Sequence, residues 1–468
     1  MNKELKKDSL PELLRQLGLF DSIMIIVGIV IGSGIFLTTG IIAKNIPSPG
    51  FILLAWVVGG LLTLAGALTY AELGASFPQA GGQYVYLREA YSPLVAFLFG
   101  WIFFLVYMTG GIAALALAFA EYFGRFFSLF SIQNSIFSTD FSLLHHTFHY
   151  SLSMGQLVGI GVIIILSGVN YIGVGPGKAI QNLFTVLKIG TLLLILGLGF
   201  TLGKGTSVEL SFHPQGFQGL DLMMGFGIAL VAVSWAFDGW NNINFVAGEI
   251  KHPQKTLPWA LILGTLTVTA LYVLINYIYL YALPMEEIVG VVPIAERAAT
   301  ALWGASAASW ISAAVIVSTF SSLNGSILAG PRVYYAMARD GLFFSKVARV
   351  HPRFHTPGFA IFIQAVWASI LTAIGTFEQI FTFAMFVAIL FWIAAVFSVF
   401  TLRKKFPHLP RPYKTWGYPL VPIVFIFAST GILLNTLVKK PVESLAGLGL
   451  TALGIPVYHY WKKRKKNR

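Results

Sequence analysis

The segment VGIVIGSGIFLTTG, residues 27–40, lies in one of the most apolar parts of the chain and yet is rich in glycine. The surrounding apolar stretch is long enough to cross a bilayer, which takes roughly 20 apolar residues in a helix. Glycine is a poor helix former, so Gly32, Ser33 and Gly34 predict an interruption in a membrane-spanning helix. Backbone N–H and C=O groups that such a break leaves unpaired must find partners, because hydrocarbon offers none.

The composition of the whole chain is that of an integral membrane protein. Of its 468 residues, 56% are hydrophobic and only 10% are charged, and the mean hydropathy is +0.77. No soluble domain of ordinary composition has these values. We predict an all-α membrane protein with twelve transmembrane helices, at residues 20–43, 49–77, 92–124, 153–172, 179–203, 222–249, 258–283, 306–336, 358–376, 379–402, 419–438 and 442–461.

The basic residues are divided unequally between the two sides of this predicted bundle. When the loops are assigned alternately to two sides, 24 of the 31 lysines and arginines fall on one side and six on the other. The positive-inside rule then places both termini in the cytoplasm, including residues 1–19 and the basic tail 462–468. This distribution accounts for the net charge of +13 without a nucleic-acid partner.

A second interruption is predicted in VSWAFDGWNNINFVAGE, residues 233–249, where Asp238, Gly239 and Asn241 fall in the middle of a span. A carboxylate at this depth costs roughly 2.5–3.5 kcal/mol on insertion scales. Glycine pairs also permit close helix packing, and GSGIF alone would be explained equally well in that way. A polar break at the corresponding place in the second half of the chain favours interruption of both helices.

Matching breaks in segments 1 and 6 predict two inverted structural repeats of five helices each. The first repeat would span residues 20–203 and the second residues 222–402, with helices 11 and 12 at 419–461. Each repeat would begin with its broken helix.

The two breaks together suit a small zwitterion. The N–H groups of Ser33, Gly34 and Ile35 would lie at the positive end of a half-helix, which favours a carboxylate. Carbonyl groups near the breaks would accept hydrogen bonds from an ammonium group. Burying two opposite charges side by side costs less than burying either alone. The carbonyls expected to face the ammonium belong to Val30, Trp235, Ala236 and Phe237.

Four motifs resemble a known family. They are IGSGIF at 31–36, AELGASFPQAGGQYVYLREAY at 71–91, WAFDGWNNINFVAGEIKHPQKTLP at 235–258 and STFSSLNGSILAGPRVYYAMARDG at 318–341. Their order and spacing are similar to those of the amino acid-polyamine-organocation superfamily, in particular its L-type amino acid transporter branch, which includes a bacterial serine/threonine exchanger. The resemblance implies a LeuT-like fold with the substrate held between helices 1 and 6.

By this resemblance, backbone groups of Ser33, Gly34 and Ile35 bind the substrate carboxylate, and carbonyls of Val30, Trp235 and Asp238 bind the amino group. Trp235 would also close the site from outside. Members of this branch in animals join a glycoprotein through a cysteine, but this chain has no cysteine. We therefore expect no disulfide-linked ancillary subunit, and likewise no metal and no cofactor.

Two charged residues inside the predicted spans are functional candidates, because charge at this depth is costly. Lys188 is too deep in its span to reach water easily, and the resemblance implies that its ammonium replaces the sodium ion of sodium-coupled relatives. Asp238 either caps the half-helix that follows it or takes part in choosing the substrate. Asn241 either lines the site or bonds to neighbouring helices.

The sequence therefore predicts a sodium-independent transporter of neutral L-amino acids, including small ones such as serine, threonine and alanine, working by alternating access as an exchanger or a facilitator. Proton-coupled uptake and transport of cationic amino acids or polyamines are the alternatives. An ion channel or an intramembrane enzyme would need a continuous polar pore or paired catalytic groups, which the sequence does not contain. The expected location is the inner (plasma) membrane of a bacterium.

Overall fold

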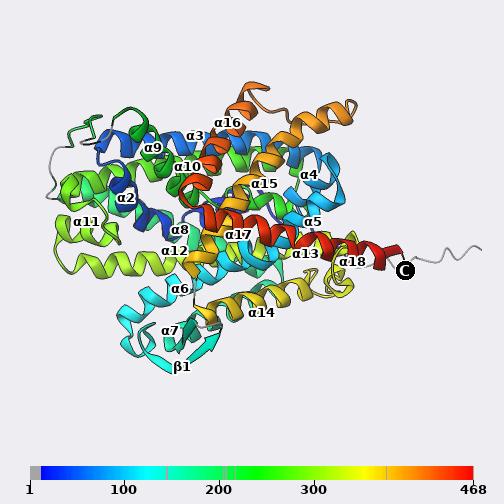
Figure 1. Cartoon of the computed structure of the whole chain (residues 1–468), viewed down its shortest axis with the longest axis horizontal. Coiled ribbons are helices and arrows are strands. Elements are labelled where there is room, and N and C mark those ends of the chain that lie inside the picture. The colour runs from blue at the N-terminus through cyan, green and yellow to red at the C-terminus, as the bar shows by residue number, and fades with distance from the viewer. Residues whose placement is uncertain are drawn as a thin grey trace, which may run out of the picture.

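The computed structural model describes residues 12–143, 146–203, 205, 208–214, 216, 218–375 and 377–466 of the chain. Most of residues 1–19 and the last two residues of the predicted basic tail thus lie outside the described part. Helices dominate, and the longest of them run side by side (Figure 1).

The described residues of the first half of the chain form ten helices and a hairpin. Its elements are α1 (Leu19–Val30), α2 (Gly34–Asn45), α3 (Pro49–Ser76), α4 (Gln83–Ala90), α5 (Pro93–Ile102), the π-helix η1 (Phe103–Tyr107), α6 (Met108–Phe126), η2 (Ser128–Phe130), β1 (Ser135–Leu143), β2 (His146–Ser153), α7 (Met154–Tyr171) and α8 (Val174–Leu202).

The second half is entirely helical within its described residues. Its elements are α9 (Gly219–Ala236), the 3-10 helix η3 (Asn242–Glu249), α10 (Pro253–Ala282), η4 (Met285–Glu287), α11 (Ile294–Trp303), α12 (Ala307–Ala329), α13 (Pro331–Arg339), η5 (Ser345–Ala348), α14 (Gly358–Ile374), α15 (Phe377–Lys405), α16 (Leu420–Lys439), α17 (Pro441–Ala452) and α18 (Gly454–Lys466).

Nine helices in the described residues are long and apolar enough to cross a membrane, or ten when the bent pair α1 and α2 counts as one span. Two of the twelve expected spans are not among them. Helix α14 has only 17 residues, which rise about 25 Å at 1.5 Å per residue. The expected span 442–461 is divided between α17 and α18, next to Pro456, which lacks the N–H of a regular helix.

The two expected breaks differ in form. Helix α1 ends at Val30 and α2 begins at Gly34, with a bend of 45° between them. Helix α9 ends at Ala236, and after turns at 237–241 the chain continues as the 3-10 helix η3, where a regular helix to residue 249 was expected. Asparagine side chains compete with the backbone here, since the amide of Asn244 donates to the carbonyl of Asn241 at 3.0 Å.

Helix α1 lies at the centre of the molecule. It packs against α10, α8 and α12, while α2 packs against α9 and α11. Most side chains of α1 after Ile23 are buried, although this helix would be apolar enough to face lipid. The first break therefore lies inside the protein, where other helices can reach its exposed backbone groups.

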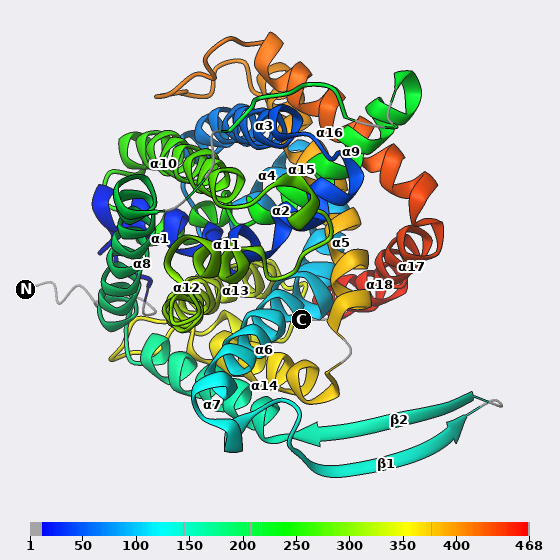
Figure 2. The ribbon, with the colours of Figure 1, turned by 90° about the vertical axis from the view of Figure 1, so that its left-hand side faces the viewer.

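Helix α4, helix α11 and the antiparallel hairpin of β1 and β2 lie outside the expected spans and were not predicted. The short helices η2, η4 and η5 were not predicted either. The hairpin follows the C-terminal end of α6 and the short helix η2, and it extends away from the helical body (Figure 2). It occupies the loop that the sequence predicted between segments 3 and 4.

A buried ion pair fastens the chain after the second break to α13. Arg332 donates from Nε and Nη2 to the two carboxylate oxygens of Glu249, at 2.7 and 2.8 Å. Both side chains are fully enclosed, with exposed fractions of 1% and 0%. Because the pair is bidentate and shielded from water, removing either side chain would leave the other charge buried without a partner.

We expect Arg332→Met to lower the free energy of unfolding by about 3–5 kcal/mol, because it leaves the Glu249 carboxylate buried without its partner. Thermal unfolding in detergent measures the change. The matched control is Arg297→Met, which removes an exposed pair with Glu287 and should cost less than about 1 kcal/mol. Equal shifts in the two variants would contradict the structural role given to Arg332.

Candidate functional site

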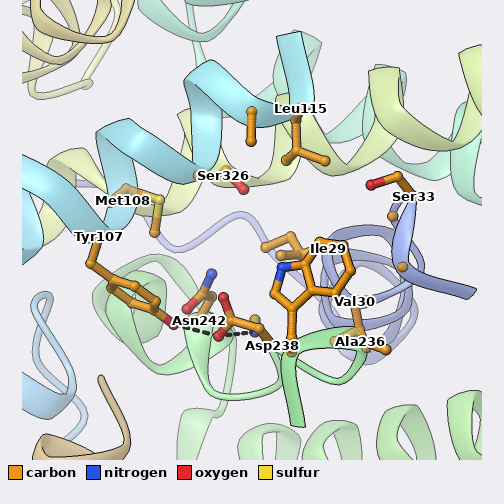
Figure 3. Close-up of a pocket in the computed structure, with 16 residues that line it drawn as sticks. Ile29, Val30, Ser33, Tyr107, Met108, Leu115, Ala236, Asp238, Asn242 and Ser326 are labelled. Carbon is orange, nitrogen blue, oxygen red and sulfur yellow. Dashed lines mark hydrogen bonds between the residues drawn. The ribbon is translucent and has the colours of Figure 1, made fainter. Parts of the chain in front are cut away.

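The two breaks border one cavity of about 90 Å³. By the same measure a single water needs roughly 10–15 Å³, so the cavity has room for a small solute. Helices α6 and α12 close it from the other side (Figure 3). Its lining residues are Ile29, Val30, Gly32, Ser33, Gly34, Tyr107, Met108, Gly111, Ala114, Leu115, Trp235, Ala236, Asp238, Gly239, Asn242 and Ser326.

Eight of the residues predicted from the sequence line this cavity: Val30, Gly32, Ser33, Gly34, Trp235, Ala236, Asp238 and Gly239. Ile35, Phe237 and Asn241 do not line it. The amide of Asn241 instead donates to Gln83 Oε1 at 3.0 Å, which is the helix-bonding role that the sequence left open. Lys188 lies behind the first break rather than in the cavity.

The two breaks are in direct contact. A Cβ atom at Gly34 would lie 3.1 Å from the Cα atom of Ala236, so a larger residue would push the start of α2 and the end of α9 slightly apart. At Gly239 the backbone has a φ of +95°, which L side chains rarely adopt. Gly34 and Gly239 therefore set the distance between the two interrupted helices.

The start of α2 presents unpaired donors. Within the described residues, the N–H groups of Ser33, Gly34 and Ile35 have no protein acceptor, as is usual for the first turn of a helix. The positive end of the helix dipole coincides with these groups. An anion in the cavity could accept hydrogen bonds from them.

The carbonyl groups at the breaks are partly occupied. The hydroxyl of Tyr272 lies 2.9 Å from the carbonyl oxygens of both Val30 and Ala236. A hydroxyl has one proton and donates to one acceptor at a time, so it cannot satisfy both carbonyls at once. The carbonyl of Val30 also accepts from the N–H of Gly32, at 2.8 Å.

Lys188 satisfies carbonyls on the far side of the first break. Its ammonium donates to the carbonyls of Gly28, at 2.7 Å, and Ile31, and to the hydroxyl of Ser322 at 3.2 Å. The side chain has an exposed fraction of 2% and lies among carbonyl and hydroxyl oxygens. No metal-binding cluster of histidine and carboxylate side chains occurs in the part of the chain that the structure describes.

Asp238 is held at the cavity wall by two donors. Its Oδ1 atom accepts from the hydroxyl of Tyr107 and from the N–H of Gly239, at 2.8 Å. The second bond goes to the next residue, not to the second or third N–H of a following helix. Asp238 therefore does not have the geometry of a helix N-cap, which was one of its two expected roles.

Sequence reasoning missed four polar residues of the site: Tyr107, Tyr272, Asn242 and Ser326. They stand on η1, α10, η3 and α12, and all are buried. Asn242 had a usable signal, because it follows the predicted break directly. The other three lie in long apolar spans where nothing in the sequence marks the face that meets the breaks.

Residues 17–448 match the amino acid permease family. The chain belongs to that family. This match confirms the resemblance to the superfamily. The resemblance to its L-type branch is also confirmed, because a bacterial serine/threonine exchanger and large neutral amino acids transporters are similar to this permease over almost its full length.

Three of these relatives are transporters by name. The permease is 35% identical to the serine/threonine exchanger SteT of Bacillus subtilis (strain 168) over 459 residues, which cover 97% of this chain and 98% of the relative. It is 31% identical to the mouse large neutral amino acids transporter small subunit 2, covering 97% and 83% of the two chains. It is 30% identical to the human cystine/glutamate transporter, covering 99% and 89%.

We expect Gly239→Ala to loosen the contact between the breaks. The new methyl group would overlap the Cγ2 atom of Ile29 and force a positive φ on a side-chain-bearing residue, at a cost of about 1–3 kcal/mol. Hydrogen–deuterium exchange in peptides covering 27–36 and 233–242 should become about tenfold faster. The control Gly190→Ala, where nothing lies within 4 Å of the new atom, should leave these peptides unchanged; equal exchange in both variants would contradict the prediction.

Proposed function

We propose that this permease is a sodium-independent transporter of neutral L-amino acids that works by alternating access, as an exchanger or a facilitator. The observation that carries the proposal is the cavity between the two breaks, bordered by unpaired N–H groups on one side and by partly occupied carbonyls on the other. This arrangement complements a molecule that carries a carboxylate and an ammonium group. The names of the relatives support the same class of substrate.

We propose a twelve-span, LeuT-like arrangement with inverted repeats at 20–203 and 222–402 and two further helices at 419–461. Ten spans are supported by length and composition, and α14 and the pair α17 and α18 would complete the twelve. The positions of the two breaks support the repeats, since each break falls in the first span of its half.

In the proposed complex the substrate carboxylate accepts hydrogen bonds from the N–H groups of Ser33, Gly34 and Ile35. The ammonium donates to carbonyls of Val30, Trp235 and Asp238. Trp235 lines the cavity and would close over the substrate from outside. Because the substrate contacts both α1–α2 and α9, its binding favours the conformation in which the two breaks are close together.

The surroundings of Lys188 support sodium independence. Its ammonium lies among the carbonyls of Gly28 and Ile31 and the hydroxyl of Ser322, which are oxygen ligands of the kind that hard cations bind. In its protonated form the lysine places a positive charge among these oxygens. A sodium ion would then find these oxygen ligands already occupied by the ammonium group of Lys188.

The proposed location is the plasma membrane of a bacterium, with both termini in the cytoplasm. The distribution of basic residues between the loops supports this orientation. Since the chain has no cysteine, it cannot be linked to an ancillary subunit by a disulfide.

The decisive experiment is exchange in proteoliposomes. Vesicles loaded with unlabelled L-serine should take up labelled L-serine at the same rate in sodium and in choline buffer, whereas empty vesicles measure net uptake. L-Alanine and L-threonine should compete for uptake, and L-lysine and spermidine should not. Uptake that requires sodium, or that only an inward proton gradient drives, would overturn the proposed mechanism.

We expect Lys188→Ala to reduce exchange at least about tenfold, because the carbonyls of Gly28 and Ile31 lose their charged donor and the first break loses its fixed geometry. The amount of folded protein should fall much less, as size-exclusion profiles measure. Lys178→Ala is the matched control on the same helix, since that lysine is partly exposed and pairs with Asp21. Exchange at the rate of the unaltered protein in Lys188→Ala would remove the lysine from the mechanism.

A further inference from the structure

A groove of about 450 Å³ lies between the start of α14, the short helix η5 and the last helix, α18, and we call it the α14–α18 groove. Phe344, Phe359, Ile363 and Trp461 form its apolar walls. Pockets that bind organic ligands have volumes of roughly 300–1,000 Å³, so the groove is large enough for one. Figure 1 shows α18 and the start of α14 at the same end of the molecule, close to the C-terminus. The proposed orientation places this end in the cytoplasm.

The groove is continuous with a surface that suits contact with lipid. Along α14, exposed apolar side chains follow one another at intervals of three or four residues, which places them on one face of the helix. They are Phe359, Phe362, Val366, Ile370 and Ile374. Phe359 belongs both to this face and to the wall of the groove. An acyl chain that lies along this face of α14 therefore reaches the groove at Phe359.

Two exposed basic side chains, Lys346 and Arg464, border the groove. Within the described residues neither of them forms an ion pair. The guanidinium carbon of Arg464 lies 5.6 Å from the centre of the Trp461 ring, which places this charge directly beside an apolar wall. The charged part of the groove is thus free to bind an anion.

The surroundings of the groove are also basic. A smaller cavity beside it shares Trp461 and Arg464 with the groove and is bordered in addition by Lys465. No described carboxylate lines either space. The positive-inside rule explains why basic residues are frequent at this end of the molecule. It does not explain why they border an apolar groove without acidic partners.

We infer that the α14–α18 groove binds an anionic phospholipid of the cytoplasmic leaflet. In this assignment an acyl chain lies along α14 and against the apolar walls, and the phosphate accepts hydrogen bonds from Lys346 and Arg464. Hydrogen bonds between such cations and phosphate are charge-assisted and strong. Basic pockets between membrane helices suit anionic headgroups in the same way.

The two halves of the groove distinguish this lipid from other ligands. A soluble anion would leave the apolar walls unused, and a zwitterionic lipid would bring a positive group toward two others. A phospholipid with a net negative charge complements both halves. The inference does not depend on the identity of the transported substrate, since lipid binding is measured without transport.

The test compares phosphatidylglycerol with phosphatidylcholine of identical acyl chains. Each lipid is added to the delipidated full-length protein in detergent, and binding is measured by native mass spectrometry. One molecule of phosphatidylglycerol should bind at least about tenfold more tightly than phosphatidylcholine, because two basic side chains contact its headgroup. Equal affinities, or displacement of phosphatidylglycerol by an equal concentration of inorganic phosphate, would overturn the inference.

A double variant assigns the preference to the groove. Lys346→Gln combined with Arg464→Gln should weaken binding of phosphatidylglycerol about tenfold and leave that of phosphatidylcholine unchanged. The matched control combines Lys251→Gln with Lys255→Gln, which removes the same charge from exposed residues outside the groove but on the same proposed side of the membrane. The control should keep the full preference. Equal losses in the two double variants would indicate a general attraction to the basic surface and would overturn the assigned site.

A further variant tests the apolar half with both basic residues in place. Ile363→Trp fills part of the groove and should weaken binding of both lipids several-fold, while size-exclusion profiles remain those of the unaltered protein. Unchanged binding of phosphatidylglycerol by this variant would show that the headgroup alone is recognised, which contradicts a lipid seated in the groove.

Discussion

A helix that ends within a membrane leaves backbone groups that hydrocarbon cannot satisfy, and this constraint organises the molecule. The chain ends two helices in this way, at Val30 and at Ala236, and brings the two ends into contact through Gly34. The surrounding helices cover both ends, so that lipid does not reach them. What remains is to satisfy each exposed N–H and C=O group either permanently, by a side chain, or temporarily, by a ligand.

The permanent partners lie on the side away from the cavity. Lys188 and Ser322 donate to Gly28 and Ile31 behind the first break, and Tyr272 donates to a carbonyl at either break. These donors hold the break open, because a regular helix through residues 31–33 would use the same carbonyls for its own hydrogen bonds. Among the described residues, the N–H groups at the start of α2 have no such partners, which leaves them available to a ligand.

The sequence predicted only some of the residues that border the breaks, and the reason is physical. Gly32 and Gly34 mark the first break because glycine is a poor helix former, and Gly239 marks the second because its positive φ favours glycine. A lysine at mid-span such as Lys188 is conspicuous because burying its charge is costly. Tyr107, Tyr272 and Ser326 give no such signal: their spans are apolar on every face, so periodicity does not reveal which face meets α1. The form of the second break was also out of reach, since the change to a 3-10 helix depends on how the side chain of Asn244 bonds to the backbone.

In the proposed mechanism, the need to pair these backbone groups also favours exchange of substrates over one-way transport. When the cavity is open, water can bond to the N–H groups at the start of α2 and to the carbonyl that Tyr272 leaves free. Closure without a substrate would expel this water and leave those groups unpaired in an apolar setting, which costs about 1–3 kcal/mol for each group. A zwitterion replaces the water with its own carboxylate and ammonium, so the loaded carrier avoids this penalty. With three donors and one acceptor involved, the empty carrier would change conformation much more slowly than the loaded one, and this difference in rate is what makes a carrier exchange one substrate for another.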